Sequence, residues 1–208
     1  VDLPGRGGVN GDLASLALIG CATKVSDQIE TWVRADHPAV LVGHSMAKVV
    51  IAGVVKRLSE SRVRRIIFVA CGLPPTGKPV LDTLPRVVSV LASHVLRTPI
   101  IDAVSLLMER FIFGNKASRA QRARIPQSFC PESTALITSK VPDDYGSLRR
   151  ILAGWVLPAC DRALPPRVQR TVMTSLEGFE NLATINAGHV LITHPDELAK
   201  HILKVING

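Results

Sequence analysis

The sequence predicts an α/β fold in which a mostly parallel sheet is flanked by helices. Residues 39–55 read as a short apolar strand that is followed at once by an apolar helix. Two more apolar runs, 65–70 and 151–157, have the length and composition of buried strands, and residues 182–205 repeat the order of strand and then helix. Because strands that alternate with helices pair in parallel, we expect one sheet and a single domain over residues 1–208.

The composition is that of a globular domain. With 208 residues, 47% of them hydrophobic and 20% charged, the chain can build one sizeable core, which argues against disorder. The net charge of +8 raises the question of nucleic acid, but the basic residues gather only in short local groups. Aromatic residues make up 4% of the chain, too few for platforms on which bases stack. We therefore expect solvated surface charge and no nucleic-acid partner.

The cysteines and the apolar runs bear on the location of the protein. Cys21, Cys71, Cys130 and Cys160 are widely spaced and form no Cys-x-x-Cys pair, so neither a zinc site nor a disulfide framework is predicted. Free thiols fit a reducing compartment, and we expect a cytoplasmic protein. The longest apolar stretch is interrupted by polar residues around Ser45, so no transmembrane helix is expected. The sequence leaves the oligomeric state open.

The most informative stretch is residues 39–47, Ala-Val-Leu-Val-Gly-His-Ser-Met-Ala. A strand that turns sharply into a helix through Gly-x-Ser-x-small holds the serine hydroxyl out at the top of a sheet. The pattern also occurs by chance around ordinary loop serines, but here an apolar strand precedes it and an apolar helix follows. We therefore predict that Ser45 is a nucleophile. The next backbone N–H, that of Met46, lies at a helix N-terminus, where it can receive a developing negative charge.

A nucleophilic serine needs a base, and His189 is the predicted base. It follows the strand 182–185 in an Asn-Ala-Gly-His loop and precedes a helix with Pro195 in its first turn. His44, inside the stretch 39–47, is expected to shape the site. The remaining histidines are read as structural or solvated: His37, His94, His194 and His201.

The base needs an orienting acid, and Asp161 is the predicted acid. It lies just beyond the run 151–157, where a carboxylate can reach an imidazole on the loop after the next strand. The alternative is a turn aspartate before a Pro-Pro pair, which is a common arrangement. Three other aspartates are less suitable. Asp143 and Asp144 precede the run 151–157, and Asp196 lies on the helix after His189 and should point away from it.

The order Ser45, Asp161, His189 matches the order of the triad in α/β-hydrolases. The chain resembles an α/β-hydrolase of the plant methylesterase and hydroxynitrile-lyase type. Four segments are similar to the family's turn after the fourth strand, its elbow, its acid loop and its histidine loop with the final helix: residues 1–7, 41–46, 161–166 and 187–199. The resemblance implies an α/β-hydrolase fold that cleaves a small-molecule carboxylic ester through an acyl-enzyme, with no metal, organic cofactor or membrane partner.

Three departures from the family matter. The chain begins where the family's fourth strand ends. We therefore expect a fragment that lacks the family's first strands. Without them, one hydrophobic edge of the strand 39–42 would be unpaired. The loop that supplies the second oxyanion N–H would also be absent. Ala47-Lys48 stands where the family usually has Gly-Gly, and Lys48 must reach solvent or find a partner. Val190 replaces a lysine that is typical of the lyases and so favours an esterase. A lyase on the same triad and a non-catalytic or decayed binding protein remain the alternatives.

Two further segments are expected to hold the substrate. Ligands of open α/β sheets bind beyond the carboxyl ends of the strands, so the loop after the strand 65–70 is predicted to contact the substrate together with His44, through Cys71, Gly72 and Leu73. Residues 79–140 have helical periodicity and no strand pattern, and they resemble the helical cap that the family inserts over its site. Before the nucleophile, residues 10–21 read as a loop and residues 26–35 as a helix.

Overall fold

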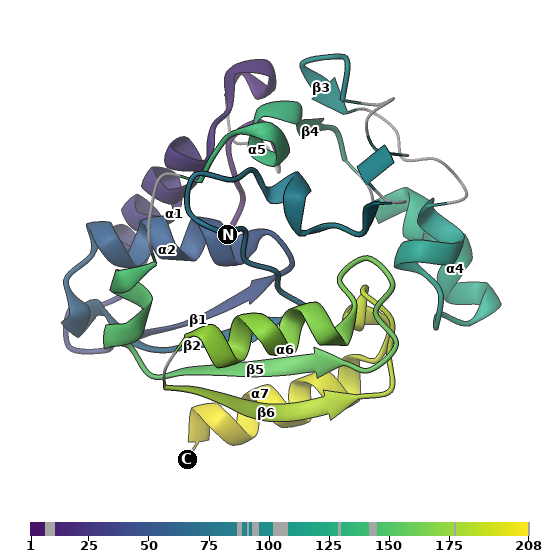
Figure 1. Ribbon diagram of the computed structural model, residues 1–208. Helices are drawn as coiled ribbons and strands as arrows, with labels where there is room; N and C mark the ends of the chain where they lie inside the picture. The colour runs from purple at the N-terminus through teal and green to yellow at the C-terminus, as the bar shows by residue number, and fades with distance from the viewer. Residues whose placement is uncertain are drawn as a thin grey trace.

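The computed structural model describes residues 1–6, 11–86, 89–90, 92, 96–101, 108–128, 130–141, 145–176 and 178–207 of the chain. A four-stranded parallel sheet in the order β1-β2-β5-β6 forms its centre (Figure 1). The four strands are β1 (Ala39–His44), β2 (Val63–Val69), β5 (Ala153–Pro158) and β6 (Phe179–Ile185). Each overlaps one of the strands predicted from the sequence, and the α/β class with a parallel sheet is confirmed.

Alternate residues of the central strands face two different cores. On β2, Ile66 and Phe68 pack into one core, while Ile67 and Val69 pack into the other. All six residues of β5 are buried, as expected of a parallel strand that is covered on both faces. Phe68 pairs with Trp155 of β5 across the ladder, and the centroids of their rings lie 5.5 Å apart. This aromatic pair lies at the centre of the larger core.

Helices cover the two faces of the sheet unequally. The larger core draws on α1 (Leu18–Trp32), α2 (Ala47–Arg57) and α6 (Pro166–Ser175). The opposite face is covered by α7 (Pro195–Asn207), whose apolar side packs against the smaller core. Figure 1 shows α6 in front of β5 and α7 behind the sheet. The helices predicted after β1 and after β6 are therefore confirmed.

Helix α1 is longer than the sequence pattern indicates. It spans Leu18–Trp32 rather than 26–35, so the predicted loop over 10–21 is wrong from residue 18 onward. Buried residues at spacings of three and four draw this segment onto the rest of the core: Leu18, Cys21, Ala22 and Ile29. The packing against α2 is close, because a Cβ atom built on Gly53 would lie 2.7 Å from the Cβ of Ala22.

The described elements between residues 79 and 140 are short. The helical ones are a 3₁₀ turn (Val80–Thr83), a π-helix (Met108–Phe113), α4 (Arg119–Ser128) and α5 (Thr134–Thr138). The prediction of no strand is wrong here, because β3 (Ile100–Ile101) and β4 (Glu132–Ser133) form an antiparallel ladder that is too short to give a sequence period. Other residues of the predicted helices lie outside the described residues: Val87, Val88, Leu91, Val95, Val104, Leu106 and Leu107.

Candidate active site

The turn between β1 and α2 is held in a strained conformation. Ser45 has a φ of 55°, in the left-handed region that non-glycine residues rarely adopt. Its N–H donates to the carbonyl of Val69 at 3.0 Å, which fixes the turn against β2. Helix α2 packs so closely on β1 that a Cβ atom on Gly43 would lie 2.5 Å from Cδ1 of Ile51. The small residue before the serine is therefore required by packing, and the strain is supported by the surrounding structure.

Three side chains from three separate segments are hydrogen-bonded in series at the carboxyl ends of the strands. Nε2 of His189 lies 2.9 Å from Oγ of Ser45, and Nδ1 of His189 lies 2.8 Å from Oδ2 of Asp161. The histidine and the aspartate are 4% and 3% exposed. Because a carboxylate accepts and does not donate, Nδ1 carries the proton and the lone pair of Nε2 faces the serine hydroxyl. The structure thus brings together the predicted nucleophile, base and acid.

The carboxylate of Asp161 is held from three sides. Oδ1 accepts from the backbone N–H of Leu164 at 2.8 Å, and Oδ2 accepts from the side-chain amide of Gln169 at 3.0 Å as well as from His189. The sequence interpretation missed Gln169. A signal was present, because Gln169 shares one face of α6 with Val172 at a spacing of three, and a polar residue in an apolar stripe is unusual.

His44 supports the histidine loop from the side of β1. Its Nε2 lies 2.9 Å from the carbonyl oxygen of His189, and the two ring centroids are 4.9 Å apart. Partial loss of water around the ring and, after it, the positive charge that His189 carries when it is protonated lower the pKa of His44, although the residue as a whole keeps solvent exposure at the edge of the sheet. A neutral imidazole whose Nε2–H donates to a carbonyl fits this geometry.

A cavity of about 480 Å³ opens beside Ser45 along the outer edge of β1. That edge is unpaired among the described residues, and Val42 on it is 47% exposed. The lining is aliphatic apart from His44 and Ser45, and none of its side chains is an acid, a lysine or an arginine: Val1, Leu3, Val25, Val40, Leu41, Val42, His44, Ser45, Met46, Ala47, Val50 and Ile51. Met46 also lies at the N-terminus of α2, and the role of its N–H stays a prediction.

The loop after β2 does not reach this cavity. Cys71 is fully buried, and its thiol donates to the carbonyl of Gly43, with Sγ 3.2 Å from the oxygen. Burial raises the pKa of the Cys71 thiol to about 12. A Cβ atom on Gly72 would lie 2.9 Å from a methyl carbon of Leu164, and Leu73 lines cavities on the side of α6. The geometry therefore assigns these three residues to support of the elbow and the acid loop, and it gives their predicted substrate contacts no support.

Lys48 does not reach solvent, and the partner that it finds among the described residues is not an oxygen atom. Its side chain is 0% exposed, and Nζ has no hydrogen-bond partner in the described part of the chain. Instead Nζ lies 4.2 Å from the ring centroid of Trp155, 4.8 Å from that of Phe68 and 5.1 Å from that of Phe179. Burial lowers the pKa of Lys48 to about 7. The partner of this cation is thus a cluster of aromatic faces rather than a carboxylate or water.

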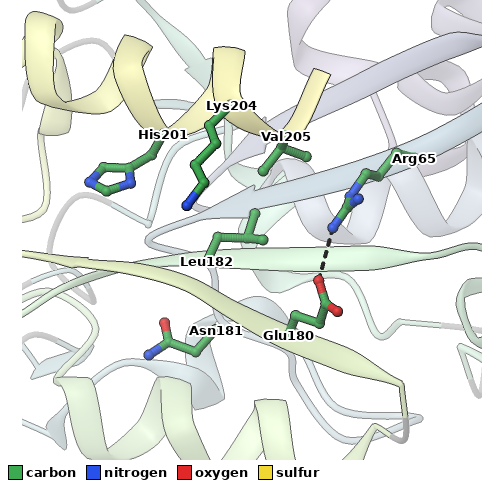
Figure 2. A pocket seen from close by; sticks show the side chains of 7 residues that line it. All are labelled: Arg65, Glu180, Asn181, Leu182, His201, Lys204 and Val205. Atoms are coloured by element: carbon green, nitrogen blue, oxygen red, sulfur yellow. Dashed lines mark hydrogen bonds and ion pairs between the residues drawn. The ribbon is translucent and has the colours of Figure 1, made fainter. Parts of the chain in front are cut away.

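A larger cavity, of about 550 Å³, lies away from these residues (Figure 2). Arg65 and Glu180, near the amino ends of β2 and β6, form an ion pair across it at 2.9 Å, and Lys204 and His201 reach it from α7. The described lining contains no serine, cysteine or threonine. Since Ser45 lies at the carboxyl ends of the strands, this cavity is not part of the site.

The other candidate residues lie elsewhere or cannot be placed. His37 contacts Asp36 on the surface, and His194 contacts Thr193 next to it in the chain. Asp196 is in the first turn of α7. His94, Asp143 and Asp144 lie outside the described residues. Over the described ranges, no helix has both the length and the apolar character needed to cross a membrane, and no group of three or more His, Cys, Asp or Glu side chains is placed to hold a metal ion.

Comparison with known proteins defines the class. The chain matches the model of the Alpha/beta hydrolase family over residues 1–201, and it belongs to that family. It is similar to an extracellular alpha/beta-hydrolase from a Paenibacillus species, with a TM-score of 0.83 and 22% identity over 98% of this chain and 85% of that one.

Two further solved structures show the same similarity of fold. One is a pyrethroid hydrolase from Sphingobium faniae JZ-2, with a TM-score of 0.74 and 19% identity over 100% of this chain and 85% of that one. The other is the methylesterase MES16 from Arabidopsis, with a TM-score of 0.72 and 12% identity over 100% and 85% of the two chains. No curated protein sequence matches the chain.

Proposed function

We propose that the protein is a serine esterase that cleaves small-molecule carboxylic esters through an acyl-enzyme. The observation that carries this proposal is the series Ser45–His189–Asp161, in which a hydroxyl, a neutral imidazole and a buried carboxylate are joined by hydrogen bonds of 2.9 and 2.8 Å. This is the arrangement that acyl transfer by serine requires, because the imidazole takes the hydroxyl proton while the carboxylate stabilises the imidazolium that forms.

The steps follow from the positions of these groups. Oγ of Ser45 attacks the ester carbonyl while Nε2 of His189 takes its proton, and the backbone N–H of Met46 receives the oxyanion. Collapse of the tetrahedral intermediate breaks the ester bond, and His189 returns the proton to the departing alcohol. His189 then takes a proton from water, the resulting hydroxide attacks the acyl-serine, and the acid leaves as the proton returns to Ser45.

Two observations support a carboxylic ester as the substrate. Among the similar structures are a methylesterase and a pyrethroid hydrolase. Val190 stands where the resemblance implies a lysine in the lyases. The four free cysteines support a reducing compartment, and we place the protein in the cytoplasm.

We also propose that residues 79–140 form a cap over the site. The ends of this segment meet, since Pro79 and Lys140 form an antiparallel bridge, as expected of an insertion. Within it, the ring of Phe113 lies 5.6 Å from that of His189. The side-chain amide of Asn115 donates to the carbonyl of Cys160 at 2.8 Å, next to the acid. Contacts with both the base loop and the acid loop are what a cap needs.

The test uses a short activated ester together with a fluorophosphonate, which labels a reactive serine covalently. We expect hydrolysis by the wild-type protein, labelling at Ser45, and loss of both in Ser45→Ala. Retained turnover in that variant would refute the nucleophile. Cyanide release from a cyanohydrin without ester cleavage would indicate a lyase instead, and tight ligand binding without labelling would indicate a binding protein.

A further inference from the structure

We propose that Gln169 is a positioning residue that fixes the carboxylate of Asp161 and connects it to the aromatic centre of the sheet. This inference rests on the proposed serine esterase. Gln169 is 0% exposed and lies on the first turn of α6, so its side chain is surrounded by protein on all sides. The hydrolytic steps above do not use Gln169, yet within the described part of the chain its side-chain hydrogen bonds go to Asp161, to Leu164 beside it and to Trp155 at the centre of the sheet.

The orientation of the Gln169 amide is determined by its neighbours. The indole N–H of Trp155 can only donate, and it lies 3.1 Å from Oε1 of Gln169. The carbonyl of Leu164 can only accept, and it lies 2.7 Å from Nε2. The amide oxygen must therefore face Trp155, and the NH₂ group must face Leu164 and Oδ2 of Asp161, which lies 3.0 Å from Nε2. The hydrogen bond to the acid is thus imposed by the surroundings.

The same oxygen of Asp161 accepts from both Gln169 and His189. The χ2 torsion of an aspartate has no sharply preferred value. A carboxylate that rotated freely about χ2 would therefore not hold either oxygen in a fixed position for His189. The N–H of Leu164 on Oδ1 and the amide of Gln169 on Oδ2 stop that rotation. Because the carboxylate is fully buried, water cannot replace the lost donor if Gln169 is removed. The consequence is a fixed acid and hence a fixed imidazole.

Two substitutions separate positioning from packing. Gln169→Met keeps the volume and removes the donor, so Asp161 keeps only Leu164 and His189. Gln169→Glu keeps the shape, but one carboxyl oxygen then faces two acceptors, the carboxylate of Asp161 and the carbonyl of Leu164. In its protonated form that oxygen can donate to Asp161 as the amide does, whereas in its ionised form it repels the acid.

The experiment measures kcat and KM for a short activated ester, the rate of fluorophosphonate labelling, and the proton resonance of the His189–Asp161 hydrogen bond by NMR. For Gln169→Met we expect kcat and the labelling rate to fall about 10- to 100-fold with KM changed less than about twofold, as for other residues that orient a functional ligand. For Gln169→Glu we expect the ratio of its activity to that of the wild-type protein to rise as the pH is lowered, because protonation restores a donor to Asp161. Gln28→Met is the matched control, because Gln28 is also buried but, among the described residues, its side chain bonds only the backbone of Asp2.

The outcomes distinguish the two proposals. A folded Gln169→Met protein with wild-type kcat, labelling and His189 resonance would overturn the positioning role, as would losses equal to those of Gln28→Met. If the wild-type protein cleaves no ester, yet the His189 resonance is altered in Gln169→Met and unchanged in Gln28→Met, then the esterase proposal fails while the positioning of Asp161 by Gln169 stands.

Discussion

Two buried polar side chains, Gln169 and Lys48, contact different parts of the indole of Trp155, and only Gln169 has hydrogen-bond partners among the described residues. Gln169 bonds the indole N–H, and both ends of its amide have partners. Lys48 lies over the face of the indole ring with Nζ 4.2 Å from the centroid, and it has no hydrogen-bond partner among the described residues. The satisfied group leads to the acid of the site. Lys48, which has no such partner, lies on α2, the helix that follows the serine, and its burial lowers the stability of the folded protein.

The comparison shows what burial does to polar groups of different charge. A neutral amide with partners for both donor and acceptor loses little on burial, because its hydrogen bonds replace those to water. An ammonium group without oxygen partners loses its hydration free energy on burial. Contact with aromatic faces compensates only part of that loss, roughly 2 kcal/mol for a desolvated pair. We expect substitutions at the two positions to act in opposite directions on the stability of the protein.

Lys48→Met should have the largest effect, and it should stabilise the protein. The pKa of Lys48 falls from 10.5 in the unfolded chain to about 7. At about 1.4 kcal/mol for each pKa unit, this net shift corresponds to a destabilisation of up to about 5 kcal/mol below pH 7, where both states carry the charge. We therefore expect Lys48→Met to gain roughly 2–5 kcal/mol in the free energy of unfolding at pH 6, measured by urea denaturation.

The pH dependence gives that prediction a sign. Between pH 7 and 10.5 the unfolded chain holds a proton on Lys48 that the folded chain has lost, so wild-type stability should rise with pH across this window. Below pH 7 both states are protonated, and the penalty is complete. Lys48→Met should lack the rise, whereas Lys56→Met, at an exposed position of the same helix, should keep it. A destabilised Lys48→Met protein would show that the rings more than offset the burial.

Trp155→Phe should have an intermediate effect. The ring face over which Lys48 lies is largely kept, but Oε1 of Gln169 loses its donor and becomes a buried acceptor without a partner. We expect a loss of about 2 kcal/mol in stability, and a fall in the labelling rate of Ser45 that is smaller than in Gln169→Met. Trp32→Phe serves as the control, since Trp32 is 69% exposed. If both tryptophan substitutions lowered the labelling rate equally, Trp155 would have no specific role in orienting Gln169 and, through it, Asp161.

Phe179→Leu should have the smallest effect, and it should change only the surroundings of Lys48 and not those of Gln169. Phe179 provides the most distant of the three rings around Lys48, at 5.1 Å, and stacks on Phe68 with ring centroids 5.7 Å apart. We expect a loss of about 1 kcal/mol in stability, because an aromatic pair and part of a cation–π contact are lost. The labelling rate of Ser45 should not change. A lower rate would mean that the cluster around Lys48 also positions the site.

The parts of the fold that follow from local sequence were the ones that could be predicted. The β1–α2 turn is written in five adjacent residues, and Gly43 and Ser45 are found in the positions that the pattern requires. The chain order was enough to suggest Asp161 and His189, since both follow strands of one parallel sheet and therefore meet at its carboxyl edge.

What the sequence could not predict depends on contacts between distant segments. The early start of α1 was readable from its apolar spacing, but that spacing is decisive only once α2 is there to cover it. The surroundings of Lys48 combine side chains from β2, β5 and β6, and no periodicity brings such residues together. Cys71 was read as a ligand contact because it follows a strand, whereas its thiol turns inward to the carbonyl of Gly43.

The strand that carries Ser45 is held by one neighbour, since β1 is hydrogen-bonded only to β2 among the described residues. Amide hydrogens on its free side should exchange with deuterium faster than those of β2 and β5, which have a neighbour on each side. β6 is the other edge strand of this sheet, hydrogen-bonded only to β5 among the described residues. The serine and the histidine therefore both follow strands with a single described neighbour, whereas the acid follows β5 at the centre. Local opening of either edge strand would separate the serine from its base while the acid stays in place.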